Sequence, residues 1–318
     1  MGDVAELVAR GRAGEPRAVG RLVSMVENAS PQLREVMAAL APHTGNAYVV
    51  GLTGSPGVGK STTTSVLLTA YRAAGKRVGV LAIDPSSPFT GGALLGDRVR
   101  MQEHATDPGV YIRSMGSRGN LGGLSWATPQ AVRVLDAAGC DVVIVETVGV
   151  GQAEVAIASL ADTTVVLLAP GMGDGIQAAK AGILEVADVY VVNKADRDGA
   201  DHTVRDLRQM MSLVEKPAPG SWKPPIVKTI ASQGEGNDAL IEALVQHREW
   251  LTTSGELERR RTARIADEIE SLAVTTLRER MGDLRGGSLL GDLASRVVAG
   301  ETDPYTAADD LIAGVTET

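Results

Sequence analysis

The chain has 318 residues and a formal net charge of −8, with 44% hydrophobic and 22% charged residues. These values are typical of a globular protein, and the acidic balance argues against nucleic-acid binding as its main function. Cys140 is the single cysteine and the four histidines are scattered, so an intrachain disulfide and a thiolate metal cage are excluded. No run reaches the roughly 18 apolar residues of a membrane span, and the N-terminus lacks a secretory pattern. We expect a cytoplasmic protein without membrane contact.

Residues 1–45 are predicted to form a helical extension. Leu22, Val23 and Val26 share one helical face, and a further helix is expected after Ser30-Pro31, because a capping serine followed by proline suits a first turn. Such helices either pad the following domain or hold a partner. The sequence leaves both interpretations open.

A phosphate-binding loop follows the first predicted strand, 47–53. Residues 54–61, GSPGVGKS, match G-x-x-x-x-G-K-[ST] at every fixed position, and a helix is expected over 61–74. Free N–H groups at the helix start would bind phosphate oxygens, the lysine would bridge the β- and γ-phosphates, and the next hydroxyl would ligate Mg²⁺. Nucleotide contacts are therefore assigned to Gly54, Ser55, Pro56, Gly57, Val58, Gly59, Lys60, Ser61 and Thr62.

Two acidic residues flank a glycine-rich segment after the second strand. Asp84 ends that strand and would reach Mg²⁺ directly or through water, while Asp97 closes the stretch 90–97, whose shape could follow the nucleotide state. Alternatively, Asp84 caps a turn and Asp97 caps a helix. Arg100 is a candidate for coupling this segment to a partner.

A second glycine-rich stretch, 115–123, predicts no regular structure. Beside it, Arg113 and Arg118 either meet a phosphate or an anionic partner, or belong to a solvated loop.

The strand at 142–145 leads into Glu146-Thr147-Val148-Gly149, where most GTPases carry D-x-x-G. In that motif the acid holds Mg²⁺ and the glycine N–H senses the γ-phosphate. Glu146 keeps the carboxylate with a longer reach, so we assign it to metal binding and, with Lys60 and Asp97, to catalysis; Gly149 is assigned to the nucleotide. Gln152 does not directly follow Gly149, so no residue is assigned to orient the attacking water.

The motif Asn193-Lys194-Ala195-Asp196 closes the fifth predicted strand. The Asp196 carboxylate can accept hydrogen bonds from guanine N1–H and the N2 amino group, whereas adenine offers no such pair of donors. Asn193 and Lys194 would support the loop and the base. Further on, the Ala231 N–H would meet guanine O6, beside Ser232. The expected nucleotide is GTP rather than ATP.

The strand pattern ends near residue 250. One long helix is expected over 256–284, followed by helices near 289–299 and 304–312. The basic run 259–261 lies among acidic residues, which indicates a solvated charged face. The apolar side of the long helix needs a cover, and such an arm often supplies a subunit interface.

The predicted fold class is α/β: a P-loop NTPase with a doubly wound, mainly parallel sheet, because most strand candidates are continuous apolar runs. Its ligand is expected at the carboxyl ends of the strands. We expect an N-terminal helical extension (1–45), a GTPase domain (46–250) and a C-terminal helical arm (251–318) that dimerises. The strand candidates lie at 47–53, 78–83, 142–145, 163–168, 189–192 and 226–229.

Together, these motifs resemble the methylmalonyl-CoA mutase-associated GTPases, MeaB and its mitochondrial counterpart, which carry Glu in the third motif. The resemblance covers nearly the whole chain. Older labels for similar sequences describe a lysine/arginine/ornithine transport kinase or ATPase. The motifs that carry it are Asp84-Pro85-Ser86-Ser87, residues 90–97, residues 146–152 and Asn193-Lys194-Ala195-Asp196.

The resemblance implies a homodimer that binds GTP or GDP with Mg²⁺ and acts as a chaperone of adenosylcobalamin-dependent methylmalonyl-CoA mutase, in cofactor loading and in protection or reactivation. A related acyl-CoA mutase stays open as the partner. Gln177 and Lys180, within 171–180, would couple the nucleotide state to that partner. The residues implied in Mg²⁺ binding and γ-phosphate sensing are Ser61, Asp84, Asp97 and Glu146.

Three alternative functions would also use a nucleotide site. A metallochaperone GTPase would carry a His or Cys cluster, which this sequence lacks. An ATP-dependent kinase serving amino-acid transport conflicts with the guanine motif. A nucleotide-binding scaffold without meaningful turnover stays open. For the GTPase, slow intrinsic hydrolysis is expected, about 10⁻⁴ to 10⁻³ s⁻¹.

Overall fold

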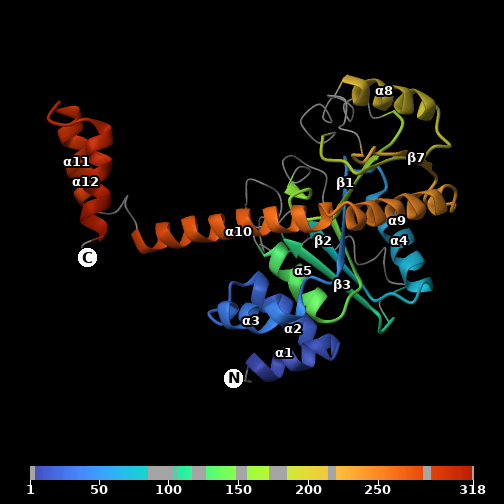
Figure 1. The fold of residues 1–318 in the computed structure, drawn as a ribbon, viewed down its shortest axis with the longest axis horizontal. Helices are drawn as coiled ribbons and strands as arrows, with labels where there is room; N and C mark the ends of the chain where they lie inside the picture. Colours follow the sequence, from blue (N-terminus) through green and yellow to red (C-terminus); the bar gives the residue numbers. More distant parts are fainter. Residues whose placement is uncertain are drawn as a thin grey trace. The chain divides into compact units, whose positions relative to one another are not determined.

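The computed structural model describes residues 4–84, 104, 106–116, 127–147, 156–171, 185–213, 220–281 and 288–316. Within these residues a seven-stranded sheet has the order β3-β2-β4-β1-β5-β6-β7 (Figure 1). Every neighbouring pair of strands is parallel. The strands are β1 (Tyr48–Thr53), β2 (Val78–Asp84), β3 (Val110–Gly116), β4 (Val142–Thr147), β5 (Thr163–Leu168), β6 (Val189–Asn193) and β7 (Ile226–Thr229). The predicted parallel α/β sheet is confirmed.

The centre of the sheet is β1, between β4 and β5. Tyr48 is opposite Val142 on β4, and Val50 is opposite Thr163 on β5. The chain leaves β1 towards β2 on one side and later crosses to β5 on the other. Parallel sheets bind ligands where the strand order reverses in this way, at the carboxyl ends. The crevice therefore opens just after Thr53, where the glycine-rich loop begins.

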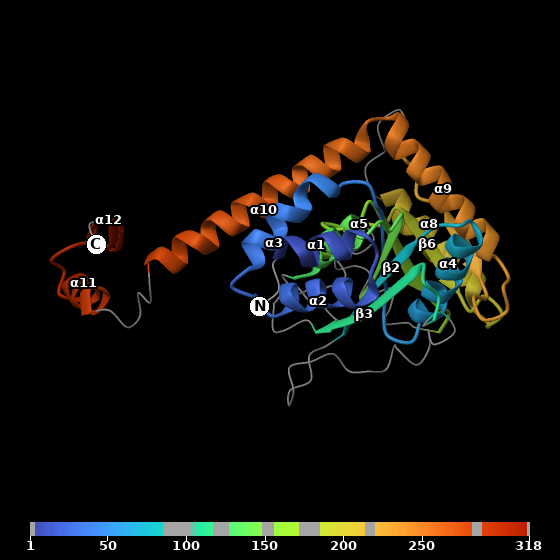
Figure 2. The same cartoon turned by 90° about the horizontal axis from the view of Figure 1, so that it is seen from below.

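Helices cover both faces of the sheet because the side chains of each strand alternate between them (Figure 2). Val49 packs under α1 (Val4–Arg12), α2 (Pro16–Glu27), α3 (Leu33–Leu40) and α5 (Thr128–Ala137). Val50 packs under α4 (Lys60–Ala73) and α9 (Asn237–Thr253). A smaller cluster joins α8 (Ala200–Leu213) to β5 and β6. The N-terminal helices thus form part of the main core.

The edge strand β3 is absent from the sequence prediction, which expected no regular structure from residue 115. Arg113 and Ser114 interrupt its apolar run, so the strand pattern is weak. The interpretation of Arg113 as a phosphate ligand or a loop residue is wrong. Its guanidinium donates to Glu27 Oε2 and, at 3.0 Å, to Ser24 Oγ. This ion pair fastens α2 to the sheet edge, and only the packed structure reveals it.

The observed start of one N-terminal helix differs from its predicted start by a few residues. The N-terminal helix expected after Ser30-Pro31 begins at Leu33, with Gln32 as its N-cap. Ser30 Oγ accepts a hydrogen bond from the Gln32 N–H at 3.3 Å, and the serine lies two residues before the N-cap position. A short 3₁₀ helix, η1 (Ala41–His43), connects α3 towards β1.

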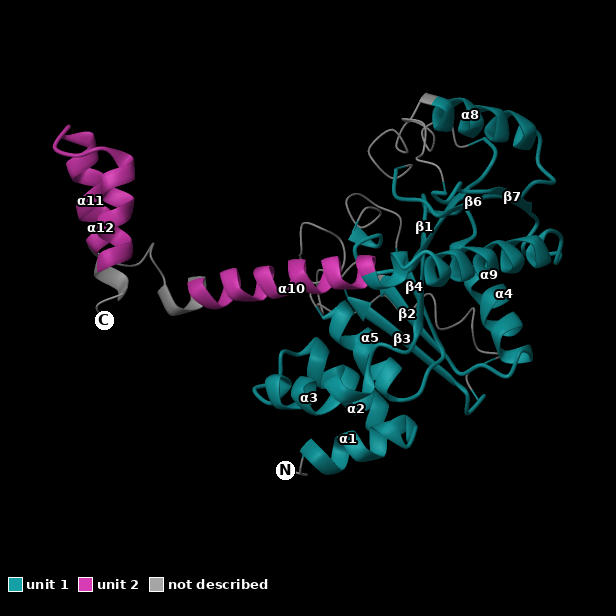
Figure 3. Cartoon of the chain, in the orientation of Figure 1, with its two compact units in different colours: residues 1–258 teal, residues 259–318 magenta. Residues whose placement is uncertain are grey.

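The chain divides into two compact units, 1–258 and 259–318 (Figure 3). The second unit contains most of α10 (Glu256–Met281) together with α11 (Ser288–Val298) and α12 (Pro304–Thr316). Helices α11 and α12 pack against each other. Large apolar side chains of α10 are exposed, among them Ile265, Ile269 and Leu272. No helix in the described part of the chain is long and apolar enough to cross a bilayer.

Candidate nucleotide site

The loop between β1 and α4 is built around glycines that no larger residue can replace without displacing backbone or a buried side chain. Gly54 has φ +139°, and a Cβ there would lie 2.2 Å from the Leu167 carbonyl oxygen on β5. Gly59 has φ +102°, and a Cβ would lie 2.2 Å from Asn193 Nδ2. The loop therefore lies directly against the ends of β5 and β6, and glycine is required for close approach as well as for conformation.

Lys60 is the first residue of α4 and is almost completely buried. Its Nζ donates to the Gly54 carbonyl at 2.7 Å and to the Ser55 carbonyl at 3.1 Å. The ammonium group thus folds back over the loop, at a helix N-terminus whose first N–H groups lack intrahelical acceptors. Positive charge and the N–H groups of the first helical turn converge at the position where a phosphate chain would bind.

Glu146 meets the same end of α4. It is 4% exposed, on β4. Its Oε1 accepts from Ser61 Oγ at 2.7 Å, and its Oε2 accepts from Thr64 Oγ1 at 2.8 Å. Ser61 therefore holds its hydroxyl oxygen directly beside the carboxylate. A hydroxyl and a carboxylate are hard oxygen ligands, so this pair fits Mg²⁺.

Thr64 is a site residue that sequence reasoning missed. Its only signal is helical spacing, since it follows Ser61 by three residues and shares its face. In the described part of the chain, no group of three or more His, Cys, Asp or Glu side chains could hold a metal ion.

Asn193, at the end of β6, connects the phosphate loop to the opposite side of the crevice. Its Nδ2 donates to the Val58 carbonyl at 2.8 Å. Its Oδ1 accepts from Thr229 Oγ1 at 3.0 Å and from the Ala231 N–H at 3.1 Å. One buried amide therefore holds the loop and the 229–231 turn in register. The Ala231 N–H, assigned above to guanine O6, donates to Asn193 in this structure.

Lys194 extends this connection with a strained backbone. Its φ is +58°, a left-handed conformation that is unusual outside glycine, and its Nζ donates to the Gly57 carbonyl at 2.6 Å. Asp196 is exposed beside it. The Asp196 carboxylate is therefore accessible to a ligand from solution, and it lies close to Lys194, which bonds to the phosphate loop.

A groove of about 720 Å³ runs between α4 and the start of α9. This volume is in the range of small-molecule sites. Ser61 and Thr62 line one wall, and Ala231 and Ser232 line the other. The groove thus brings together residues that the sequence assigned separately to the phosphates and to the base.

Several assigned residues cannot be placed in this site. Asp84 is the last residue of β2, at the same edge of the sheet. The remaining assigned residues lie outside the described residues: Asp97, Arg100, Gly149, Gln177 and Lys180.

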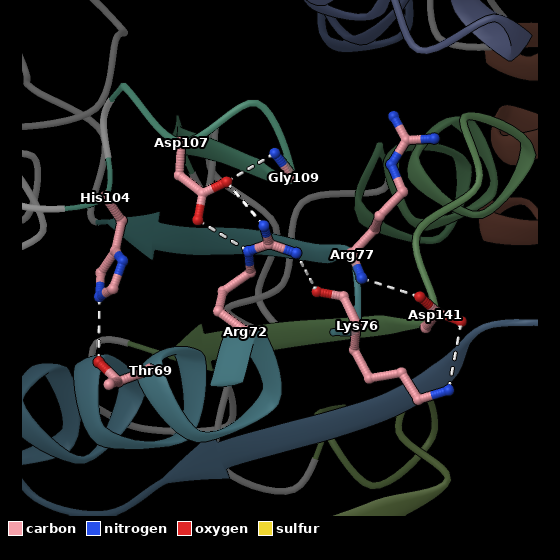
Figure 4. A network of polar contacts seen from close by, with 8 residues as sticks. All are labelled: Thr69, Arg72, Lys76, Arg77, His104, Asp107, Gly109 and Asp141. Carbon is pink, nitrogen blue, oxygen red and sulfur yellow. Dashed lines mark hydrogen bonds and ion pairs between the residues drawn. The ribbon is translucent and has the colours of Figure 1, made fainter. Parts of the chain in front are cut away.

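Helix α4 also binds the residues that precede β3 (Figure 4). Arg72 donates from Nε and Nη2 to the two Asp107 oxygens, each at 2.8 Å. Thr69 Oγ1 lies 3.1 Å from His104 Nε2. The guanidinium hydrogen bonds lower the pKa of the Asp107 carboxyl, assisted by the Gly109 N–H. The helix that starts at the phosphate loop therefore also fixes the entry to β3.

The parallel sheet, the glycine-rich loop after β1 and the guanine motif at the end of β6 define a P-loop GTPase. The family model "Methylmalonyl Co-A mutase-associated GTPase MeaB" matches residues 19–286. The chain belongs to this family.

Known relatives agree with the family. A Pyrococcus abyssi protein that bears a GTPase name is 48% identical over 309 residues, covering 96% of this chain and 95% of that protein. The Caenorhabditis briggsae "Methylmalonic aciduria type A homolog, mitochondrial" is 40% identical over 219 residues, covering 67% and 53%. The crystal structure of a "LAO/AO transport system kinase" has a TM-score of 0.73 at 25% identity, covering 98% and 97%. This last name matches the older label.

Proposed function

We propose that this GTPase uses its nucleotide state to control cofactor loading, and protection or reactivation, of an adenosylcobalamin-dependent methylmalonyl-CoA mutase or a related acyl-CoA mutase. The family description and the name of the C. briggsae relative support this partner. The structural observation that carries the proposal is the contact of Glu146 with Ser61 at 2.7 Å. This hydrogen bond joins the end of β4 to the phosphate loop. A structural change at the phosphates would therefore be transmitted to β4.

Different residues are proposed to bind different parts of the nucleotide. The loop N–H groups and Lys60 bind the phosphates, and Asn193 keeps the loop aligned with the base side. Ser61 and Glu146, which are hydrogen-bonded to each other, would both hold Mg²⁺. The ion supplies charge neutralisation at the phosphates when bound. Asp97 and Asp84 are proposed as further metal-site residues, and Gln177, Lys180 and Arg100 as coupling residues. Basal hydrolysis should be slow, about 10⁻⁴ to 10⁻³ s⁻¹.

The central experiment measures GTP turnover of the full chain alone and with a purified adenosylcobalamin-dependent acyl-CoA mutase. We expect a stimulation of about ten-fold or more, in proportion to complex formed. Gln177→Ala and Lys180→Ala should keep the basal rate and lose the stimulation, whereas the matched surface variant Lys223→Ala should keep both. An unchanged rate with mutase present would remove the main support for this partner.

Nucleotide preference separates this proposal from an ATP-dependent kinase. Asp196→Asn replaces an acceptor for two guanine donors with an amide that can satisfy only one, while it matches the C2 carbonyl of xanthine. We expect the variant to bind GDP at least about 100-fold more weakly and to gain affinity for xanthosine diphosphate. Preference of the wild-type protein for ATP over GTP would refute the guanine assignment.

We further propose a cytoplasmic homodimer formed through the C-terminal helices. Ile265, Ile269 and Leu272 recur at helical spacing on α10 and are 44%, 62% and 53% exposed. An apolar stripe of this kind is stabilised when a second copy covers it. Ile269→Glu should convert the dimer to a monomer in light scattering, while Glu268→Gln should not. A wild-type monomer at micromolar concentration would contradict this proposal.

A further inference from the structure

A second cavity lies at the amino ends of the strands, whereas the phosphate loop lies at their carboxyl ends. It has a volume of about 420 Å³, within the range of sites for small metabolites. Asn46, Lys76 and Asp141 line it just before the amino ends of β1, β2 and β4. Strands of this length separate the two edges by roughly 20 Å, so this cavity is distinct from the groove beside α4.

Its walls come from parts of the chain that are distant in sequence. Arg12 is the last residue of α1, His43 belongs to η1, and Arg248 lies on α9. Ala137, Gly139 and Cys140 form the floor at the end of α5. The cavity therefore joins the N-terminal helical extension to the GTPase core within one compact unit.

The two acidic groups of the cavity are already engaged. Asp136 accepts the Gly45 N–H at 2.5 Å and the Ala47 N–H at 2.9 Å, one on each oxygen. Asp141 accepts the Arg77 N–H at 2.8 Å, and its other oxygen lies 3.7 Å from Lys76 Nζ (Figure 4). Both carboxylates therefore bind groups of the protein itself.

The end of α5 points its carbonyl groups towards this region, and these groups are also paired. The Gly139 N–H donates to the Asp136 carbonyl at 2.8 Å, and the Cys140 N–H donates to the Leu135 carbonyl at 3.1 Å. Their pairing weakens the negative end of the helix dipole.

The two arginines, in contrast, have no acidic partner within the described residues. Arg12 makes no hydrogen bond or ion pair there, and the Arg248 guanidinium lies 4.9 Å from the Tyr48 ring centroid, with its face on the ring. That contact leaves the N–H edge of Arg248 exposed. Arg77, which does not line the cavity, bonds to Tyr111 instead. A planar guanidinium with free N–H groups pairs bidentately with a carboxylate or a phosphate.

We propose that this cavity binds a small organic anion, whose carboxylate or phosphate group is held by Arg12 and Arg248 with Lys76 beside them. Such a ligand would connect α1 and α9 and stabilise the attachment of the N-terminal helices to the GTPase core. It would act at a distance from the nucleotide, so GDP and the anion should bind together.

Isothermal titration of the full chain saturated with GDP and Mg²⁺ tests this site, because the phosphate loop is then filled. Succinate and inorganic phosphate are titrated separately at constant ionic strength. We expect saturable binding of at least one; succinate alone would identify a carboxylate ligand and phosphate alone a phosphate ligand. Arg12→Gln and Arg248→Gln should each weaken that binding about ten-fold or more, the loss expected for one charged hydrogen-bonding partner.

The matched control is Arg21→Gln, which removes the same charge from an exposed position on α2 outside the cavity. It should bind the anion like the wild type, and all three variants should keep their affinity for GDP. Arg12→Gln is the decisive variant because it removes no hydrogen bond or ion pair among the described residues, whereas Arg248→Gln also loses the contact with the Tyr48 ring. Absence of saturable binding for both anions, or equal affinity of Arg12→Gln and Arg21→Gln, would overturn the proposal.

Discussion

Replacement of Asn193 by alanine tests whether one buried amide holds the two halves of the nucleotide site together. The side chain is 3% exposed and makes three hydrogen bonds, to the Val58 carbonyl, Thr229 Oγ1 and the Ala231 N–H. A net value of about 1 kcal/mol for each bond predicts a loss of about 3 kcal/mol. The loss would be near the upper end of ordinary single substitutions because buried donors at Thr229 and Ala231 lose their acceptor.

The assay is urea unfolding without nucleotide, followed by tryptophan fluorescence. Trp222 and Trp250 lie close together in the same compact unit, with ring centroids 5.9 Å apart, and should report its unfolding. GDP affinity is measured in parallel and should fall about ten-fold or more, because the phosphate loop loses its support.

Gln233→Ala is the matched control. Gln233 is exposed in the turn after β7, and its side chain makes no hydrogen bond within the described residues. This variant should stay within about 0.5 kcal/mol of the wild type. If Asn193→Ala also unfolds within that margin and keeps its GDP affinity, the amide does not connect the loop to the base side and the reasoning fails.

Three further predictions concern the site and the core. Glu146→Gln should leave the free energy of unfolding within about 1 kcal/mol, because an amide can still pair with two hydroxyls, but Mg²⁺ should no longer strengthen GDP binding; retained Mg²⁺ dependence would contradict the metal assignment. Gly54→Ala should cost more than about 3 kcal/mol in urea unfolding, because its Cβ would meet the Leu167 carbonyl at 2.2 Å, whereas Gly75→Ala, with φ +75° and no neighbour within 4 Å, should cost about 1 kcal/mol; equal costs would refute the steric argument. Burial raises the pKa of the Cys140 thiol to about 12, so native protein should resist iodoacetamide at pH 8. Its contribution to stability should be complete below an unfolded pKa of about 8.5 and fall as pH rises from there to about 12, since the unfolded thiol loses its proton first; alkylation of native protein at the unfolded rate would contradict the burial.

Much of the fold and the site is readable from contiguous residues. The buried strands β1, β4, β5 and β6 are short apolar runs, and such runs predict parallel strands with both faces covered. The loop 54–61 and the guanine motif need only local spacing, because phosphate and base recognition use the backbone and side chains of one turn. The predicted bounds of β5 match the observed ones, and those of β1, β4 and β6 differ by one or two residues.

The elements that were missed depend on residues far apart in the chain. β3 pairs with β2, and its Arg113 bonds to Glu27, 86 residues away. The Glu146 contact with Thr64 spans 82 residues, and the Asn193 bond to Val58 spans 135. The anion cavity likewise needs Arg12 and Arg248 at one sheet edge.

The sequence by itself therefore determined the class of fold, the nucleotide and the family. The tertiary structure decided which hydroxyls face the Glu146 carboxylate and which amide joins the two sides of the crevice. It also decided which arginines have no acidic partner in the described part of the chain. The physical reason is that periodicity and turn chemistry act within a few residues. Burial and ion pairing, by contrast, are decided only when distant segments pack together.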